Sequence, residues 1–193
     1  MRKFLPWIIV GGIVLIGIFY YMNVKNSALH KSQDVGEQWG NVQTAYQRRN
    51  DLIGNLVNTV KGAADFEKST LVEVTQARAN ATAVKIDPTN ITPQQLQAFN
   101  SAQSNVSSSL SRLLVSVEKY PELKANQNFL KLQDELASTE NQILTNRTRF
   151  NEAVKSYNYY ILGMPQSFFL GSYKEKPFFE SVTGADKPVE VKF

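Results

Sequence analysis

An uncharged apolar run near the start of the chain is the feature that most constrains its fold. No charged residue lies between Lys3 and Lys25, and residues 4–22 approach the roughly 20 apolar residues that cross a bilayer as a helix. Amphipathic aromatic rings, which favour the headgroup region, stand at the two ends of the run: Trp7 at one end, Tyr20 and Tyr21 at the other. Residues 1–25 are therefore predicted to form a transmembrane anchor that contacts membrane lipid through residues 4–22.

A cleaved signal peptide is the alternative interpretation of this run. Signal peptides usually have an apolar region of about 7–15 residues, followed by small residues at the cleavage site. This run is longer, and it ends in Tyr20-Tyr21-Met22 instead of small residues. The pattern favours an uncleaved anchor.

The charges that flank the run predict its orientation. Arg2 and Lys3 precede it, whereas Lys25 and Lys31 follow it and are offset by nearby acidic residues. Basic residues are retained preferentially on the cytoplasmic side. We therefore expect a single-pass protein of the bacterial cytoplasmic (inner) membrane, with the N-terminus inside and the soluble domain outside the cytoplasm.

Apolar residues recur every three and four positions through most of the remaining chain, which is the pattern of amphipathic helices. The first such stripe runs from Val35 to Val84 without a change of phase, and Pro88 predicts that this helix ends near Lys85. A second helix is predicted from the capping box of Thr92-Pro93-Gln94-Gln95 to Tyr120-Pro121. A third helix is predicted from there to about Leu162.

The predicted fold class is all-α, because no stretch alternates at period two long enough to indicate a sheet. An N-terminal transmembrane helix is followed by an elongated antiparallel helical bundle in residues 26–162 and an aromatic-rich tail in residues 163–193. Short links make consecutive helices antiparallel, and an up-down-up path leaves residues 35–53 without a partner in the chain. Either the first helix folds back near Gly54, making a four-helix bundle, or another subunit covers this stripe.

Four charged residues interrupt the apolar stripes and are candidate contact residues. They are Arg49 and Glu67 in the first stripe, and Glu140 and Arg147 in the third. One interpretation places them at the edge of the stripe with their charged ends in water. The other pairs them in partly buried contacts that fix helix register, since an unpaired buried charge is costly. A third interpretation gives these residues a ligand-binding or catalytic role.

The tail carries aromatic residues that allow two interpretations: Phe168, Phe169, Tyr173, Phe178 and Phe179. Such residues usually cover an apolar groove of a bundle. Alternatively, Phe168, Phe169, Phe178 and Phe179 anchor the tail to another protein or to a membrane.

Two helical blocks and the tail carry a resemblance to a known family. The first block extends from Trp39 to Arg78 and contains Arg48-Arg49-Asn50-Asp51-Leu52-Ile53-Gly54-Asn55-Leu56-Val57. The second contains Glu140-Asn141-Gln142-Ile143, Arg147, Phe150-Asn151, Val154 and Tyr157-Asn158, and the ending runs from Met164-Pro165 to Lys176-Pro177-Phe178-Phe179-Glu180. Together they resemble the LemA family over nearly the whole chain, although that family usually has proline at the position of Gly54. The resemblance implies a bacterial membrane-anchored helical bundle with no established enzymatic activity.

The residue types limit the possible chemistry. The sequence has no cysteine and a single histidine, His30, beside the apolar run, so the usual zinc ligands and a convincing His-based triad are lacking. No glycine-rich phosphate loop is present. The net charge is +4, but basic and acidic residues are interspersed, which disfavours nucleic-acid binding. We predict no enzymatic activity, no cofactor, and no catalytic, cofactor-binding or metal-binding residue.

Long apolar stripes without catalytic motifs favour contact between proteins. The leading hypothesis is a membrane-anchored scaffolding protein of the bacterial envelope that self-associates or binds other envelope proteins. The alternative is a ligand-binding sensory module, in which a small molecule occupies the bundle interior. A cavity lined by the polar stripe residues would support that alternative. An enzyme would need a cleft that holds titratable groups with perturbed pKa values.

Overall fold

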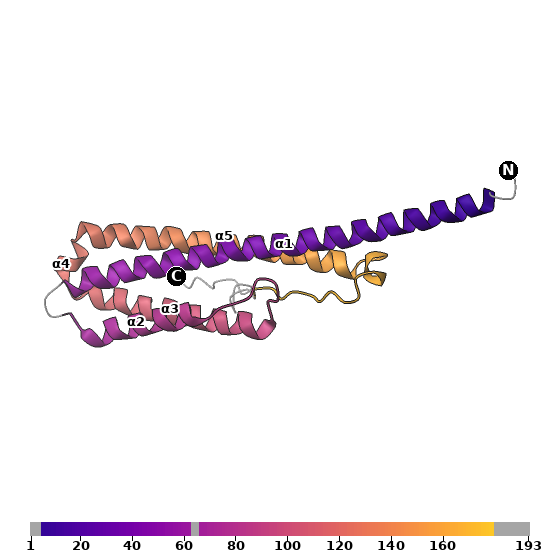
Figure 1. Cartoon of the computed structure of the whole chain (residues 1–193). Coiled ribbons are helices and arrows are strands. Elements are labelled where there is room, and N and C mark those ends of the chain that lie inside the picture. The colour runs from indigo at the N-terminus through magenta and orange to yellow at the C-terminus, as the bar shows by residue number, and fades with distance from the viewer. Residues whose placement is uncertain (1–4, 63–65, 180–193) are drawn as a thin grey trace, which may run out of the picture.

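The computed structural model describes residues 5–62 and 66–179, and every regular element in these ranges is helical. In chain order the elements are the α-helices α1 (Leu5–Lys61), α2 (Lys68–Ala83), α3 (Pro93–Val117), α4 (Pro121–Lys124) and α5 (Gln127–Leu162), and the 3-10 helix η1 (Gln166–Phe168). The prediction of an all-α fold is confirmed. Figure 1 shows an elongated bundle from which the N-terminal part of α1 projects alone.

The helix α1 joins the apolar run to the bundle without interruption. It has 57 residues, which corresponds to about 85 Å. Its most apolar stretch has a mean hydropathy of 2.0, and large side chains there, such as Ile16 and Phe19, are exposed. Among the described residues this is the one helix that is long and apolar enough to cross a membrane.

The chain reverses after Lys61, so the prediction of one helix from residue 35 to residue 84 is wrong. The helices α1 and α2 are separate and antiparallel, and with α3 and α5 they form four long elements, as the fold-back alternative expected. The reversal does not lie at Gly54, which is inside α1. On the far side of the reversal, α2 buries Leu71, Val74 and Ala81 against the same core as α1.

The other predicted helix boundaries are only partly right. The capping box of α3 is present: Thr92 Oγ1 accepts a hydrogen bond from the Gln95 amide at 3.2 Å, and Gln95 Oε1 accepts one from the Thr92 amide at 3.0 Å. The third predicted helix is divided into α4 and α5. Asn126 caps the start of α5 by accepting from two backbone amides, and α5 ends at Leu162, as expected.

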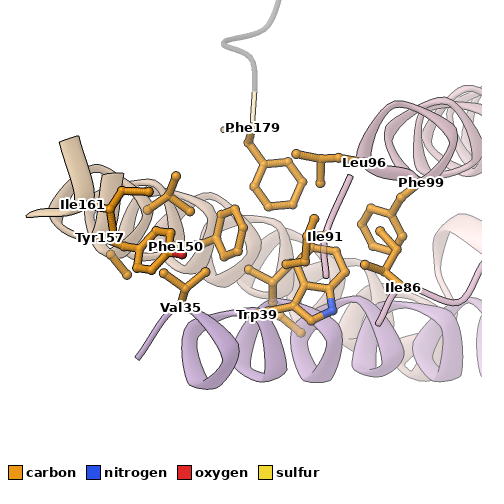
Figure 2. Close-up of a cluster of buried hydrophobic side chains, with 14 of the residues drawn as sticks. Val35, Trp39, Ile86, Ile91, Leu96, Phe99, Phe150, Tyr157, Ile161 and Phe179 are labelled. Carbon is orange, nitrogen blue, oxygen red and sulfur yellow. The ribbon is translucent and has the colours of Figure 1, made fainter. Parts of the chain in front are cut away.

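The stripe of α1 that the sequence left without a partner is covered within the chain. Val35, Trp39 and Val42 are completely buried. Figure 2 shows Trp39 surrounded by rings from α3, α5 and the tail. The ring centroids of Phe99, Phe150 and Phe179 lie 5.2, 5.6 and 5.9 Å from that of Trp39. The stripe therefore does not require a second subunit to cover it.

Candidate interaction groove and the contacts that support it

A buried arginine connects three helices at the middle of the bundle. The Arg49 guanidinium of α1 donates to Glu140 Oε1 of α5 at 2.9 Å, to Ser107 Oγ of α3 at 3.1 Å and to Gln103 Oε1 of α3 at 2.5 Å. It also lies over the ring of Tyr46, with the guanidinium carbon 4.9 Å from the ring centroid. The Arg49 side chain is 3% exposed and that of Glu140 is 43% exposed, so one end of this ion pair reaches solvent.

The buried surroundings of this arginine alter the acidity of its neighbour. Burial raises the pKa of Tyr46, and the positive charges of Arg147 and Arg49 partly offset this.

Gln103 was overlooked as a functional residue, although it is a polar residue within the apolar stripe of α3. That interruption is the sequence signal that could have identified it.

Of the other two charged stripe residues, Glu67 lies outside this cluster, whereas Arg147 lies close to Tyr46. Glu67 is the exposed N-cap residue of α2, and its carboxylate accepts a hydrogen bond from Ser69 Oγ at 2.9 Å. The Arg147 guanidinium carbon lies 4.7 Å from the centroid of the Phe179 ring. The structure thus brings Arg49 and Glu140 together, while a role of these four residues in register or partner binding stays a prediction.

Three adjoining hollows run across the exposed sides of α1 and α2, and we call them together the α1–α2 groove. They have volumes of about 510, 430 and 700 Å³. The first and second share Asp51 and Asn55, and the second and third share Lys61 and Thr75. Their remaining lining residues are Gln43, Thr44, Gln47, Arg48 and Leu52, then Gly54, Val57, Asn58 and Arg78, then Phe66, Lys68, Leu71, Val72 and Gln76.

The groove is most polar in its middle hollow and more apolar toward both ends, and basic side chains line all three hollows. Its lining contains four basic side chains and one carboxylate, Asp51, which lies 3.9 Å from Arg78 in an exposed and therefore weak ion pair. Val72 at the far end is 66% exposed. Gly54 lines the middle hollow. A Cβ atom at this position would lie 3.0 Å from Arg78 Nη1, so the absence of a side chain allows the guanidinium to pack against α1.

Two asparagines of α5 hold the tail against the bundle. Asn151 Nδ2 donates to the Phe179 carbonyl at 3.0 Å and its Oδ1 accepts from the Phe179 amide at 2.8 Å. Asn158 makes the same pair of bonds with Lys176, both at 2.9 Å. The two asparagines are seven residues apart and therefore lie on one helix face. Helical spacing in the sequence predicts that the two asparagines share a face. It does not predict that they bind the tail, because the tail backbone shows no periodic pattern.

The tail also contains a buried amine. Lys176 is 8% exposed, and its ammonium nitrogen lies 5.4 Å from the centroid of the Tyr157 ring. Burial lowers the pKa of Lys176, and the nearby Asp87 partly opposes this shift. Within the described residues, no three histidine, aspartate or glutamate side chains gather closely enough to hold a metal ion.

The predicted tail aromatics separate into two groups. Phe179 is 3% exposed and stacks on Trp39, so it fills the groove between α1 and α5. Phe168 is 76% exposed, and Phe169 and Phe178 are also exposed. Of the predicted anchor aromatics, Trp7 lies on the free part of α1, whereas the rings of Tyr20 and Tyr21 meet Phe169 edge to face, with centroids 5.8 and 6.0 Å apart.

These features define a class of protein: an all-helical rod of four long elements, headed by a helix of membrane-spanning length and tied across its core by a buried arginine. The sequence model of the LemA family matches residues 38–193. The chain therefore belongs to the LemA family, and the resemblance seen in its sequence is confirmed.

Three similar bacterial proteins match most of the chain. Protein LemA of Metamycoplasma hominis is 28% identical over 148 residues, which cover 76% of this chain and 64% of that protein. Magnetosome protein MamQ 2 of Paramagnetospirillum magneticum is 25% identical over 183 residues, which cover 85% of this chain and 67% of that protein. Magnetosome protein MamQ of Magnetospirillum gryphiswaldense is 24% identical with the same coverage. The chain thus spans about two thirds of the length of these relatives.

Proposed function

We propose that this protein is a membrane-anchored scaffold whose α1–α2 groove binds an acidic, partly apolar segment of another envelope protein. The observation that carries the proposal is the continuity of α1, which joins the apolar run to the groove as one helix. The distance along α1 from Met22 to Asn55 is about 50 Å. A partner bound in the groove is thereby held at a set distance from the bilayer.

The shape and charge of the groove support a protein partner over a small molecule. Small-molecule sites are concave, mostly apolar and bury most of the ligand. The α1–α2 groove is a series of joined surface hollows with a polar, cationic middle and more apolar ends. Protein interfaces combine an apolar centre with a polar rim, and charge complementarity selects the partner. The basic lining favours an acidic partner segment.

The sensory alternative receives less support from the bundle interior. Arg49 and Glu140, which would have lined a ligand cavity, contact each other, and the core around them is filled by buried side chains. Neither residue lines the three hollows of the groove. Self-association also has less support, because the stripe that called for a second subunit is covered by α5 and the tail.

Photo-crosslinking in intact cells tests the proposal. A photoreactive residue in place of Asn58, which is exposed in the groove, should give one discrete adduct with another protein. The same residue in place of Ser138, exposed on α5, is the matched control and should give none. The double variant Lys61→Glu, Lys68→Glu should abolish the Asn58 adduct by reversing charge at two exposed positions.

The outcomes separate the competing interpretations. An adduct with twice the mass of the 21.7 kDa chain would show that the groove binds a second copy of this chain and not another protein. Absence of an adduct at Asn58, or equal yield from Ser138, would contradict binding in the groove.

A further inference from the structure

The end of α5 and η1 lies beside the point where the apolar run of α1 ends. Phe169 meets Tyr20 and Tyr21 edge to face, and the Tyr160 hydroxyl donates to the Val24 carbonyl at 3.4 Å. Figure 1 shows this turn alongside α1 where α1 leaves the bundle. If α1 crosses a bilayer, this turn therefore lies at the level of the lipid headgroups.

This turn exposes a cluster of large apolar side chains, which we call the proximal tip. Its members are Tyr159, 81% exposed, Leu162, 57%, Met164, 70%, Phe168, 76%, and Phe169, 39%. Single exposed apolar residues are ordinary on protein surfaces, but five large ones gathered at one end of a bundle indicate contact with another apolar phase. The Asn151 and Asn158 contacts hold the chain only from Lys176 onward, so Met164, Phe168 and Phe169 lie before the part of the tail that these contacts fix.

Basic side chains stand next to the proximal tip on the side of the bundle. Lys25 lies over the Tyr21 ring, with its nitrogen 5.0 Å from the centroid. Lys31 donates to Ser156 Oγ at 2.8 Å and lies 5.7 Å from the centre of the Tyr160 ring. An apolar tip with adjacent ammonium groups fits a bilayer surface, where the tip enters the acyl boundary and the amines meet anionic headgroups.

We propose that the proximal tip docks into the surface of the same bilayer that α1 crosses. The occupant is lipid because the tip is continuous, through Phe169, Tyr20 and Tyr21, with the apolar surface of α1. The rod then has two attachments to the membrane, the spanning helix and the tip, and these together limit the tilt of α1. This inference depends on the anchor of the proposed function but not on the partner in the groove.

The absence of cysteine from the sequence permits a direct test with the full chain. A nitroxide spin label is placed at Phe168→Cys in vesicles of phosphatidylcholine and phosphatidylglycerol. Its collisions are measured with oxygen, which concentrates in lipid, and with a water-soluble nickel chelate. We expect the label at residue 168 to lose nickel collisions and gain oxygen collisions relative to Ser108→Cys, an exposed site on α3.

A second substitution and a reference site make the test decisive. Met164→Asp, which removes no buried contact, should shift the label at 168 toward water, whereas Val115→Asp on α3 should not. A label at Ile13→Cys tests whether α1 crosses the bilayer. If this label collides freely with the nickel chelate, α1 does not cross the bilayer and the proposal is contradicted.

Two other results would overturn the proposal. One is a label at 168 that collides with nickel as often as the label at 108 while Ile13→Cys is protected. The other is line broadening at 168 that disappears on dilution with unlabelled chain, because this would assign the tip to a second copy instead of lipid.

Discussion

Arg49 illustrates, at the scale of a residue, how a charge is accommodated inside the bundle. Its guanidinium is almost completely buried, and its hydrogen bonds reach a carboxylate, an amide and a hydroxyl on two other helices. Burial of a charge is tolerated when it is paired and hydrogen-bonded. Because Glu140 is 43% exposed, water screens this pair and reduces what it contributes below the value for a fully buried one.

Glu140→Gln should lower the free energy of unfolding by about 1–2 kcal/mol, because the buried guanidinium of Arg49 loses its counter-charge. Chemical denaturation followed by circular dichroism measures the change. Glu152→Gln, which neutralises an exposed carboxylate on the same helix, is the matched control and should change little. Equal effects of the two substitutions would show that the Arg49–Glu140 contact does not stabilise the fold.

The buried amine of Lys176 predicts a pH dependence of tail docking. Burial lowers the pKa of Lys176 in the folded state below the ordinary 10.5. Between the folded-state pKa and 10.5, the unfolded chain therefore binds more protons than the folded chain. Stability therefore rises with pH in that window. Burial raises the pKa of Tyr46 and Tyr157 from 10.0, and the stability that this contributes is lost only above that pH, so measurements should stay below pH 10.0.

Trp39 provides the readout for this pH dependence, because its ring stacks on Phe179 of the tail. In a Trp7→Phe background, the denaturation midpoint seen by Trp39 fluorescence should increase with pH. Lys176→Met keeps the aliphatic chain and removes the titrating group, so it should raise the midpoint and flatten its pH dependence. An unchanged slope in this variant would assign the titration to another group.

At the scale of an element, α5 binds the tail through two amides that act as clamps. Each of Asn151 and Asn158 both donates to and accepts from the tail backbone. Asn158→Asp has almost the same shape but cannot donate to the Lys176 carbonyl, which is left buried without its partner. We expect a loss of about 1–3 kcal/mol.

Release of the tail distinguishes this effect from general destabilisation. Asn158→Asp should expose Trp39 to an aqueous quencher before the helices unfold, because Phe179 leaves its ring. Asn141→Asp, at an exposed position of α5, should leave the quenching unchanged. If the two variants behave alike, the clamps do not position the tail.

The helix α1 offers a matched pair of glycines that tests how closely Arg78 packs on this helix. Gly40 has open space at its Cβ position, whereas a Cβ at Gly54 would lie 3.0 Å from Arg78 Nη1. Alanine in place of Gly40 should raise the free energy of unfolding by about 1 kcal/mol through helix propensity.

Gly54→Ala should stabilise the fold less than Gly40→Ala, because the Arg78 guanidinium must move off α1. That movement is tolerated, since Arg78 is the flexible end of a partly exposed side chain. Denaturation midpoints of the two variants give the comparison. A large loss of stability in Gly54→Ala alone would show that the Arg78 guanidinium cannot move away from α1.

At the scale of the whole molecule, the continuity of α1 couples the apolar run to the bundle as one rigid element. Its flanking charges predict that the bundle lies outside the cytoplasm. The cysteine-free chain allows a test with Ser108→Cys on α3. A membrane-impermeant maleimide should label this thiol in spheroplasts without lysis. Labelling that requires lysis would place the bundle in the cytoplasm and reverse the predicted orientation.

Several elements of this fold were predictable because their signals are local. The apolar run, the capping box at Thr92 and the end of α5 at Leu162 each depend on residues within a few positions of one another. Three- and four-residue spacing buries one face of a helix wherever that helix packs. This is why the all-α class and some of the helix limits follow from the sequence.

The position of the reversal after Lys61 is different, because the apolar stripe continues in phase from α1 into α2 and shows no break. The partners of Arg49, Asn151 and Asn158 lie up to 91 residues away along the chain. Helical periodicity states which face of a helix is buried but not which element buries it. The LemA membership, the all-α class and the apolar run were therefore determined by the sequence. Tertiary packing alone decided that α5 and the tail cover Trp39, that the groove opens on α1 and α2, and that the proximal tip remains uncovered.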